Sequence, residues 1–394
     1  MSSVELHLKP GGRHKVLHGH PWVFSNQLQG VPAALTPGAV VDVIDARGRF
    51  VGRGHGHPNA LISARLLTRD RGQPIDGELV QRRLSEALAL RRRVCPTRRA
   101  FRWVFGEADG LPGVVIDRFE SERTRAVVAL GSAGAESMSD WIADALPGLG
   151  VDDALFKCDG RGRRLEGLEP RVEALCGDPS GTWTADDDGI AVQFDPWEGQ
   201  KTGLFLDMWE NRRRMVPALS GRMADLYSYV GQWGLHAARA GADVVCVDRS
   251  EAALAQATAS AERAGLGSRL TTERADVLKW LRAQAPGGFD SVVCDPPAFV
   301  QSKKQLKDGC RGYVSVFAAA LTAVKSGGVA VLASCSSHVD DALFGDLIRE
   351  AAGRARVDVR VLMRGEQAPC HPVPIAQPES RYLTCWLVSV SDRD

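Results

Sequence analysis

The sequence predicts an α/β protein whose C-terminal part is a doubly wound, Rossmann-like sheet. From about residue 218, short apolar runs alternate with helical periods, which is the pattern of parallel strands joined by crossover helices. A glycine-bearing turn follows the first of these runs, and an acid ends the second. The expected strands are Met223–Tyr227, Asp243–Val247, Leu270–Glu273, Ser291–Cys294, Val329–Ala333, Val357–Leu362 and Leu383–Val390.

A small β-rich domain is expected at the start of the chain, over residues 1–75. The run Ala39–Asp45 alternates between apolar and polar residues, and four closely spaced glycines follow it. Alternation with period two predicts a half-buried strand, and glycines at this spacing mark turns or bulges. The segment therefore reads as short strands separated by turns.

The middle of the chain, residues 76–197, is expected to be an α+β domain that begins with a basic helix. Residues 79–94 place leucines on one face and arginines around them, which suits a helix that links domains or touches phosphates. Strand-like runs flank a helical stretch near 136–146. The acidic span 178–189 is either a connection or a hairpin, and residues 198–394 form the C-terminal domain.

Composition restricts the class of protein. The chain has 394 residues, of which 44% are hydrophobic, so it can bury two or three cores. No apolar stretch has the length of a signal peptide or a membrane span, so we expect a cytoplasmic protein without a membrane partner. The nine cysteines show no metal-ligand spacing, and we expect reduced thiols and no metal site.

Positive charge is concentrated near the N-terminus. Residues 1–100 carry 16 Lys and Arg against 7 Asp and Glu, a balance of +9, so the remainder must be near −8 for the total of +1. A basic domain beside a neutral or acidic one is typical of enzymes that bind polyanions, although arginines also simply solvate a surface. Lys9, Arg13 and Lys15 are the candidate RNA contacts in this domain.

The first strand of the C-terminal sheet leads into a candidate cofactor turn. Asp225 and Tyr227 end the strand, Gly231 and Gly234 allow close approach of the backbone to a ligand, and Asp248 follows 23 residues after Asp225. A carboxylate at that position can accept hydrogen bonds from ribose hydroxyls. The pyrophosphate fingerprint G-x-G-x-x-G is missing, so S-adenosylmethionine fits better than a nicotinamide dinucleotide.

Three neighbouring residues complete the predicted cofactor set in the sheet. Asp276 follows the third strand and is a candidate contact for the adenine amino group. Its alternative role is a helix N-cap before residues 277–283. Arg249 and Val277 adjoin the two acids and are included as candidate cofactor contacts.

A carboxylate and a thiol follow the fourth and fifth expected strands. Asp295 stands in Asp-Pro-Pro-Ala-Phe, and Cys335 stands in Ser-Cys-Ser. Because the carboxyl ends of such strands meet at one crevice, both groups should face one ligand. Thiolate attack at carbon 6 of cytosine activates carbon 5 for methylation, so we assign Cys335 as nucleophile and Asp295 as a partner for the base edge. The alternative is that Cys335 is only a small buried residue.

The segment after Asp295 contains further candidates. Cys310 is the second candidate nucleophile, and Arg311 and Tyr313 are candidate RNA contacts through phosphate pairing and base stacking. Capping and core packing are the equally open alternatives for these last two residues. A helix expected near Asp340 can favour the thiolate form of Cys335.

These residues, together with five motifs, resemble the PUA-containing family of bacterial large-subunit ribosomal RNA cytosine carbon-5 methyltransferases. The resemblance covers nearly the whole chain. It is carried by His20-Pro21-Trp22-Val23-Phe24, Gly106-Glu107-Ala108-Asp109-Gly110, Gln200-Lys201-Thr202-Gly203-Leu204-Phe205, and the Asp295 and Cys335 turns.

The resemblance implies a PUA-like RNA-binding domain, a class I methyltransferase domain, S-adenosylmethionine as cofactor and 23S ribosomal RNA as partner; it leaves a homodimer open. It also implies that Lys201, Thr202 and Phe205 flank the cofactor and that Asp295 lies near its sulfonium. Other cytosine methylases carry a second cysteine where this chain has Ala298, so a mechanism with one cysteine is implied.

Other functions remain open on the sequence. An acid followed by two prolines and an aromatic also resembles the motif of RNA nitrogen methyltransferases acting on guanine or adenine, for which Cys335 would be dispensable. A noncatalytic RNA-binding ribosome assembly factor with the same fold would tolerate loss of Asp248 or Asp295. A nicotinamide dehydrogenase is disfavoured by the missing phosphate fingerprint.

Overall fold

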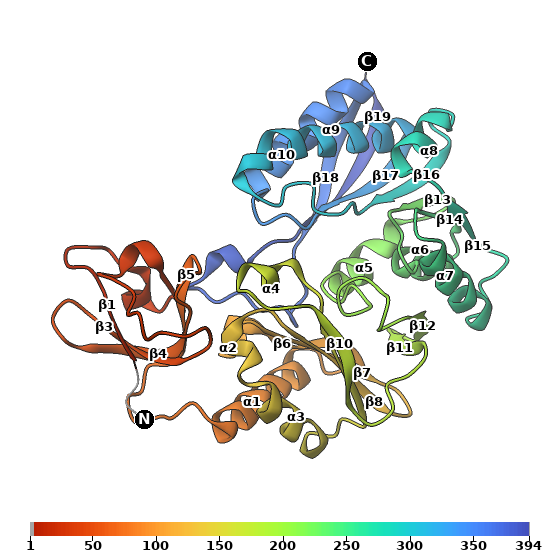
Figure 1. Cartoon of the computed structure of the whole chain (residues 1–394). Coiled ribbons are helices and arrows are strands. Elements are labelled where there is room, and N and C mark those ends of the chain that lie inside the picture. The colour runs from red at the N-terminus through yellow and green to blue at the C-terminus, as the bar shows by residue number, and fades with distance from the viewer. Residues whose placement is uncertain (1–3, 394) are drawn as a thin grey trace. The chain divides into compact units, whose positions relative to one another are not determined.

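The computed structural model describes residues 4–393 and divides the chain into two compact units (Figure 1). Unit 1 contains residues 1–181, 195–203 and 369–378, and unit 2 contains residues 182–194, 204–368 and 379–394. None of the helices within 4–393 is both long and apolar enough to span a membrane.

The first part of unit 1 is the expected small β-rich domain. Its elements are β1 (Val4–His7), η1 (Lys15–His18), β2 (Trp22–Phe24), η2 (Ser25–Gln27), β3 (Val40–Ile44), β4 (Phe50–Gly56) and β5 (Ile62–Thr68). The strands form one sheet in the order β1-β3-β4-β5-β2. A Cβ atom at Gly54 would overlap the carbonyl of Arg65, so this glycine is needed where β4 approaches β5.

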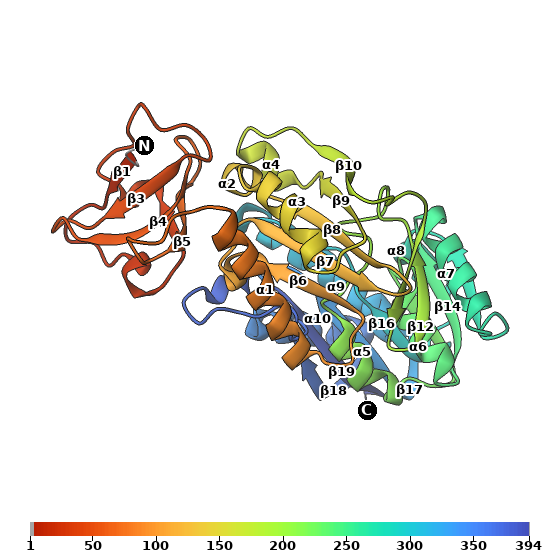
Figure 2. The same cartoon turned by 90° about the horizontal axis from the view of Figure 1, so that it is seen from below.

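A second five-stranded sheet, in the order β10-β9-β8-β7-β6, forms the rest of unit 1. Helices α1 and α3 contact each other and cover one face of it (Figure 2). Its elements are α1 (Gly77–Val94), β6 (Ala100–Phe105), η3 (Gly106–Asp109), β7 (Val114–Glu120), β8 (Thr124–Leu130), α2 (Ala133–Glu136), α3 (Ser139–Gly148), β9 (Asp153–Cys158), α4 (Arg161–Leu165) and β10 (Arg171–Cys176).

The basic helix is present as α1, but one of its arginines is not a surface cation. Asp76 caps the helix by accepting the amide of Leu79 at 2.9 Å. Arg91 is completely buried and forms two hydrogen bonds of 2.5 and 2.7 Å with the carboxylate of Asp109. For Arg91 the expectation of a phosphate contact is wrong, because a buried, paired guanidinium cannot reach a polyanion.

The acidic span near 178–189 contains a hairpin, β11 (Trp183–Asp187) and β12 (Ile190–Phe194). The hairpin packs within unit 2, where β12 contacts α7 (Glu251–Arg263) and the amide of Gln193 donates to Ser260 Oγ at 2.9 Å. The hairpin thus forms a separate two-stranded sheet that belongs to unit 2, although it precedes the expected boundary at 197/198.

Unit 2 is built on the expected doubly wound sheet, with strand order β15-β14-β13-β16-β17-β19-β18. The strands are β13 (Arg222–Leu226), β14 (Asp243–Asp248), β15 (Leu270–Arg274), β16 (Phe289–Cys294), β17 (Val324–Ser334), β18 (Val357–Gly365) and β19 (Thr384–Asp392). The other elements are α5 (Trp209–Met215), η4 (Val216–Ala218), α6 (Gln232–Arg239), α7, α8 (Val277–Ala283), η5 (Lys303–Gln305), α9 (Leu306–Ala323), α10 (Asp341–Ala355) and, where the chain re-enters this unit, η6 (Pro378–Ser380).

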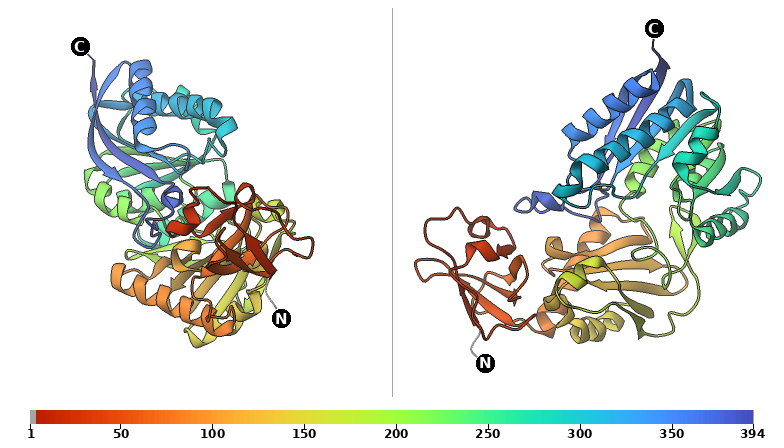
Figure 3. Two further views of the ribbon diagram at one scale, coloured as in Figure 1. Left: turned by 90° about the vertical axis from the view of Figure 1, so that its left-hand side faces the viewer. Right: turned by 45° about the horizontal axis from the view of Figure 1, so that its top comes forward.

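Helices cover both faces of this sheet. Helices α8, α9 and α10 lie side by side on one face, and α6 and α7 lie together on the other (Figures 1 and 3). The core between the sheet and α8–α10 includes Val292 and Leu332 from the strands and Phe317 and Phe344 from the helices. Apolar side chains on both faces explain why the strands read as continuous hydrophobic runs.

One strand departs from the expected parallel arrangement. β19 pairs antiparallel with both β17 and β18, while β13 to β17 are parallel to one another. After β18 the chain returns through a long connection and fills the position between β17 and β18. The side chains of β19 are mostly buried, so hydrophobicity alone did not distinguish its direction.

Candidate active site

Parallel pairing of three central strands brings the predicted functional residues to one edge of the sheet. Leu226 of β13 pairs with Cys294 of β16, and Cys294 pairs with Leu332 of β17. Asp295 directly follows β16, and Cys335 directly follows β17. The Cys335 Sγ lies 4.0 Å from the carbonyl oxygen of Pro296. The thiol is therefore beside the turn that carries Asp295, as the sequence predicted.

The turn after β13 has an unusual backbone. Tyr227 and Tyr229 both have positive φ, at 60° and 51°, and Gly231 follows at 75°. Left-handed backbone at non-glycine residues costs about 1–3 kcal/mol each and is concentrated at ligand sites. Asp248 holds this turn, because its Oδ2 accepts the Tyr229 amide at 2.9 Å and its Oδ1 accepts the Ser250 amide at 2.8 Å. The lone pairs that remain on this carboxylate are those available to a ribose.

Asp225 supports the same turn from inside the protein. Its side chain is 1% exposed, and its Oδ2 accepts the amide of Gly234 at 2.8 Å. Burial, with smaller contributions from the nearby Asp295 and Asp248 carboxylates, raises the pKa of Asp225 to about 7. A Cβ at Gly234 would lie 2.6 Å from Cys246 Sγ, so glycine is required for α6 to pack this closely. Asp225 thus stabilises the turn through a hydrogen bond from the protein interior.

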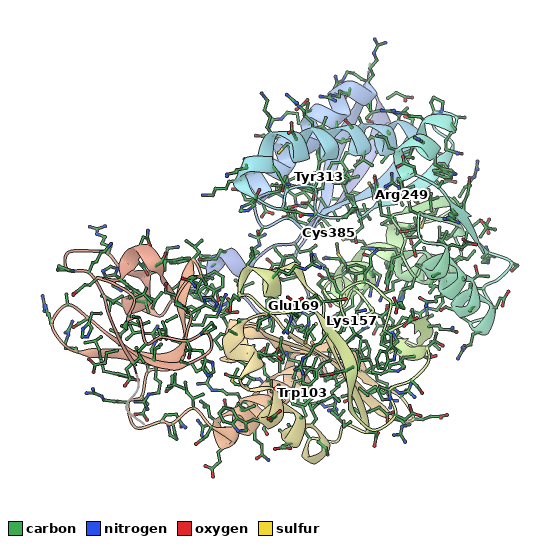
Figure 4. All side chains as sticks on the ribbon, viewed as in Figure 1. Trp103, Lys157, Glu169, Arg249, Tyr313 and Cys385 are labelled. Atoms are coloured by element: carbon green, nitrogen blue, oxygen red, sulfur yellow. The ribbon has the colours of Figure 1, made fainter. Side chains whose placement is uncertain are left out.

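Asp276 has the helix-capping role that was one of its two alternatives. Its Oδ1 accepts the Lys279 amide at 2.9 Å at the start of α8. Its other oxygen pairs with the exposed Arg249 (Figure 4), and the amide and the guanidinium lower the pKa of Asp276. Val277 is buried in the core between the sheet and the helices, so its side chain belongs to packing. A contact of these residues with adenine stays a prediction.

The segment expected to flank the cofactor is divided between the two units. Lys201 and Thr202 belong to unit 1, where the Thr202 hydroxyl donates to the buried carboxylate of Asp117. Phe205 belongs to unit 2, and its ring contacts Tyr229 edge-on with centroids 5.4 Å apart. Only Phe205 is therefore placed on the cofactor turn by contacts within one unit.

A buried polar network behind this turn was not anticipated. Gln232 donates from Nε2 to Asp187 at 2.8 Å and accepts the Phe205 amide on Oε1 at 3.2 Å. Asp187 also binds Arg212 at 2.9 Å, and both of these side chains are almost fully buried. The β11–β12 hairpin thus holds α6 and the Phe205 segment together. The acidic span was visible in the sequence, but its partners lie 25 or more positions away.

Burial separates Cys335 from six of the other eight thiols. Cys335, Cys310 and Cys176 are half-buried, and the remaining six cysteines are buried. Burial raises the pKa of Cys294, Cys246 and Cys385 well above the ordinary value, and raises that of Cys310. Because the thiolate is the reactive form, these four are poor nucleophiles. Among residues 4–393, no group of three or more His, Cys, Asp or Glu is arranged to hold a metal ion.

Known proteins resemble the chain over nearly its full length. A PUA-like domain matches residues 6–69, and the S-adenosylmethionine-dependent methyltransferase family matches residues 162–380. A protein of Alteromonas mediterranea named ribosomal RNA large subunit methyltransferase I is 35% identical, covering 99% of this chain and 100% of its own. A protein of the same name from Shewanella denitrificans is 34% identical, with coverages of 97% and 98%. The chain belongs to this methyltransferase family.

Solved structures support the same fold. The crystal structure of a methyltransferase in complex with SAH superposes with a TM-score of 0.82 at 17% identity, covering 98% of this chain and 100% of that one. The chain is thus an S-adenosylmethionine-dependent methyltransferase with an N-terminal PUA-like domain, and S-adenosylmethionine is its cofactor. The fold and the cofactor predicted from the sequence are confirmed.

The residues of this methyltransferase that were predicted to contact RNA differ in their exposure to solvent. Lys9, Arg13 and Lys15 are exposed on the PUA-like domain, and Arg311 is exposed on α9 and pairs with Asp308 at 3.2 Å. Tyr313 is completely buried in the core. Stacking on a base requires an exposed ring face, so the stacking prediction for Tyr313 is wrong and the core-packing alternative is correct.

Two glycines of α9 allow the Asp295 loop to lie against the helix. A Cβ at Gly309 would approach the Phe299 carbonyl oxygen to 2.6 Å, whereas a Cβ at Gly312 would meet only the Phe299 ring, at 3.2 Å. We expect Gly309→Ala to displace the loop and to lower the rate of methyl transfer about 10- to 100-fold. Gly312→Ala, which adds the same methyl group to the same helix, should retain most activity. Equal rates for the two variants would contradict this reading of the loop.

The buried Asp225 carboxyl should make stability depend on pH. Its folded pKa of about 7 exceeds the ordinary 3.8, so stabilisation present below pH 4 is lost as the pH rises toward 7. Asp225→Asn keeps an acceptor for Gly234 but cannot titrate. Relative to this variant, the wild type should lose on the order of 1 kcal/mol of unfolding free energy per pH unit in that window. Urea denaturation at several pH values measures the difference; a constant difference would show that Asp225 titrates normally.

Proposed function

We propose that the protein transfers a methyl group from S-adenosylmethionine to carbon 5 of a cytosine in large-subunit (23S) ribosomal RNA through a covalent bond to Cys335. The observation that carries the proposal is the half-buried Cys335 thiol beside the Asp295–Pro296 turn, at the ends of two adjacent strands. Two relatives that match nearly the whole chain carry the name of ribosomal RNA large subunit methyltransferases. The proposal includes a cytoplasmic location, where such RNA is made and assembled.

The cofactor is assigned to the turn after β13. The left-handed Tyr227, Tyr229 and Gly231 shape the backbone there, the Asp248 carboxylate ends the next strand, and the Phe205 ring lies against the turn. These features suit a nucleoside joined to an amino acid without phosphate groups, since no phosphate-binding fingerprint is present. Asp248 would hold the ribose, and Asp276 with Arg249 would border the adenine. When bound, the cofactor supplies an electrophilic methyl group.

The chemistry proposed for the chain's own residues begins at the thiol. The Cys335 thiolate adds to carbon 6 of cytosine, and the electron pair of the 5,6 double bond moves toward carbon 5. Carbon 5 takes the methyl group; loss of its proton then re-forms the double bond and expels the thiolate. Asp295 accepts a hydrogen bond from the exocyclic amino group and so orients the ring. The base must leave its stack, because carbon 6 is otherwise inaccessible.

The thiol environment favours this proposal over nitrogen methylation. A nitrogen methyltransferase needs an acid at the end of β16 but no thiol at the end of β17. Here the turn that carries Cys335 has a serine on each side, both buried, and the thiol faces the acid-bearing turn. The position of Ala298, where a second cysteine stands in some relatives, leaves Cys335 to form and break the bond alone.

We expect Cys335→Ala to abolish formation of 5-methylcytidine, because no other group near Asp295 can add to the base. Cys310→Ala tests the second candidate thiol and should retain the activity, since the Cys310 side chain packs against the core. Nucleoside mass spectrometry after incubation with large-subunit RNA and labelled cofactor measures both, and affinity for the cofactor should stay within a few-fold. Label in guanosine or adenosine that survives Cys335→Ala would support the nitrogen-methylating alternative.

The exposed cations of the PUA-like domain should bind RNA phosphates. Replacing Lys9, Arg13 and Lys15 together by alanine should weaken RNA binding at low salt and reduce the slope of log K against log salt by about 2–3. A matched triple variant at Arg282, Arg349 and Arg354, which are exposed in unit 2, serves as the control. The same salt slope in both triple variants would rule out this phosphate-binding surface.

A further inference from the structure

Tyr313 is buried where α9 meets the loops that follow β16 and β17. Tyr313, which Figure 4 labels, is fully buried. Its ring contacts those of Phe299, at a centroid distance of 4.8 Å, and Phe317, at 5.6 Å. Phe299 belongs to the loop that carries Asp295, and Phe317 belongs to the same helix as Tyr313. The ring therefore packs as a phenylalanine would, and its hydroxyl is the atom that requires a separate explanation.

The hydroxyl of Tyr313 joins three groups from two loops. Ser334 Oγ donates to it at 3.0 Å, and the amide of Phe299 donates to it at 3.4 Å. It lies 2.9 Å from Ser336 Oγ. A tyrosine hydroxyl has one proton and two lone pairs. Because both lone pairs are used by Ser334 and Phe299, its own proton points to Ser336.

The same hydrogen-bond network includes the two serines on either side of Cys335. Ser336 Oγ accepts the amide of Val300 at 3.4 Å, and the amide of Ser336 donates to Ser334 Oγ at 3.3 Å. Ser334 and Ser336 are the two neighbours of Cys335, while Phe299 and Val300 follow Asp295 by four and five residues. The Ser336–Ser334 bond lies within the turn of the thiol, and the other bonds join that turn, directly or through Tyr313, to the loop of the acid.

We propose that Tyr313 is a positioning residue that holds the Cys335 turn against the Asp295 loop through its hydroxyl. This inference deepens the proposed function and rests on it. A thiolate must approach carbon 6 at bonding distance while the acid holds the base edge, so the separation of the two loops controls the rate. The surrounding core is apolar, so a polar group that loses its hydrogen bond there is costly to leave unsatisfied.

The test compares variants that each remove one oxygen atom. Tyr313→Phe removes the hydroxyl that joins the two loops, and Ser336→Ala removes the oxygen that accepts the proton of the Tyr313 hydroxyl. Tyr382→Phe is the matched control, because its hydroxyl donates to Asp207 at 2.6 Å elsewhere in unit 2. For each folded variant we would measure kcat and KM for methyl transfer, the affinity for S-adenosylmethionine, and the rate at which iodoacetamide modifies Cys335, followed by peptide mass spectrometry.

We expect Tyr313→Phe to lower kcat about 10- to 100-fold while KM for S-adenosylmethionine stays within about twofold. Modification of Cys335 should become about fivefold faster, because loss of a hydrogen bond loosens its turn. Modification of Cys310 in the same digest should not change. Ser336→Ala should act in the same direction, and combining it with Tyr313→Phe should add little, because the two share one bond. Tyr382→Phe should resemble the wild type.

Unchanged kcat and unchanged Cys335 modification in a folded Tyr313→Phe variant would overturn the proposal, as would fully additive effects of Tyr313→Phe and Ser336→Ala. If Tyr313→Phe fails to fold, Ser336→Ala decides by the same two readouts. The modification rates do not depend on the RNA product. If the wild type forms no 5-methylcytidine, the proposed function fails, while the thiol measurement still decides whether Tyr313 holds the Cys335 turn.

Discussion

Side-by-side pairing of β13, β16 and β17 is the constraint on which the rest of the site depends. Three parallel strands in register deliver three loops to one edge of the sheet, although the strands end at Leu226, Cys294 and Ser334, far apart in the chain. Backbone hydrogen bonds set this register, and buried side chains on both faces prevent slippage. The register of the strands thus places the Cys335 thiol beside the carbonyl of Pro296.

Loops placed by a sheet still need to be held, and here buried polar groups do so. Asp225 holds the cofactor turn through Gly234, Asp248 holds it through Tyr229, and Tyr313 joins the other two loops. Each of these side chains binds backbone or hydroxyl groups that would otherwise be unsatisfied in a dry interior. The exposed surface of the site is thus small compared with the buried network that shapes it.

The raised pKa of Asp225 shows one consequence of this design. A carboxyl group that is buried below two other carboxylates is expensive to ionise, yet it is placed to receive an amide at the start of α6. The strained tyrosines of the same turn add a second local cost. The buried carboxyl lies near the end of β13, and the strained backbone lies in the turn that follows it. Such unfavourable local features are typical of ligand-binding turns, and the rest of the fold must supply the stability that offsets them.

Strand positions and the placement of the candidate reactive residues were predictable from local patterns. The seven strands of the large sheet in unit 2 match the apolar runs closely, and Asp295 and Cys335 were chosen as candidates because each directly follows such a run. The direction of β19 was not predictable, since a buried strand has the same composition in either direction. The roles of Arg91, Tyr313 and Gln232 were also missed or misassigned, because a side chain's partners are distant in the chain and its burial depends on them. Periodicity and strand-end chemistry are local properties, so residue order alone reveals them, whereas burial and partnership arise only when distant segments pack together.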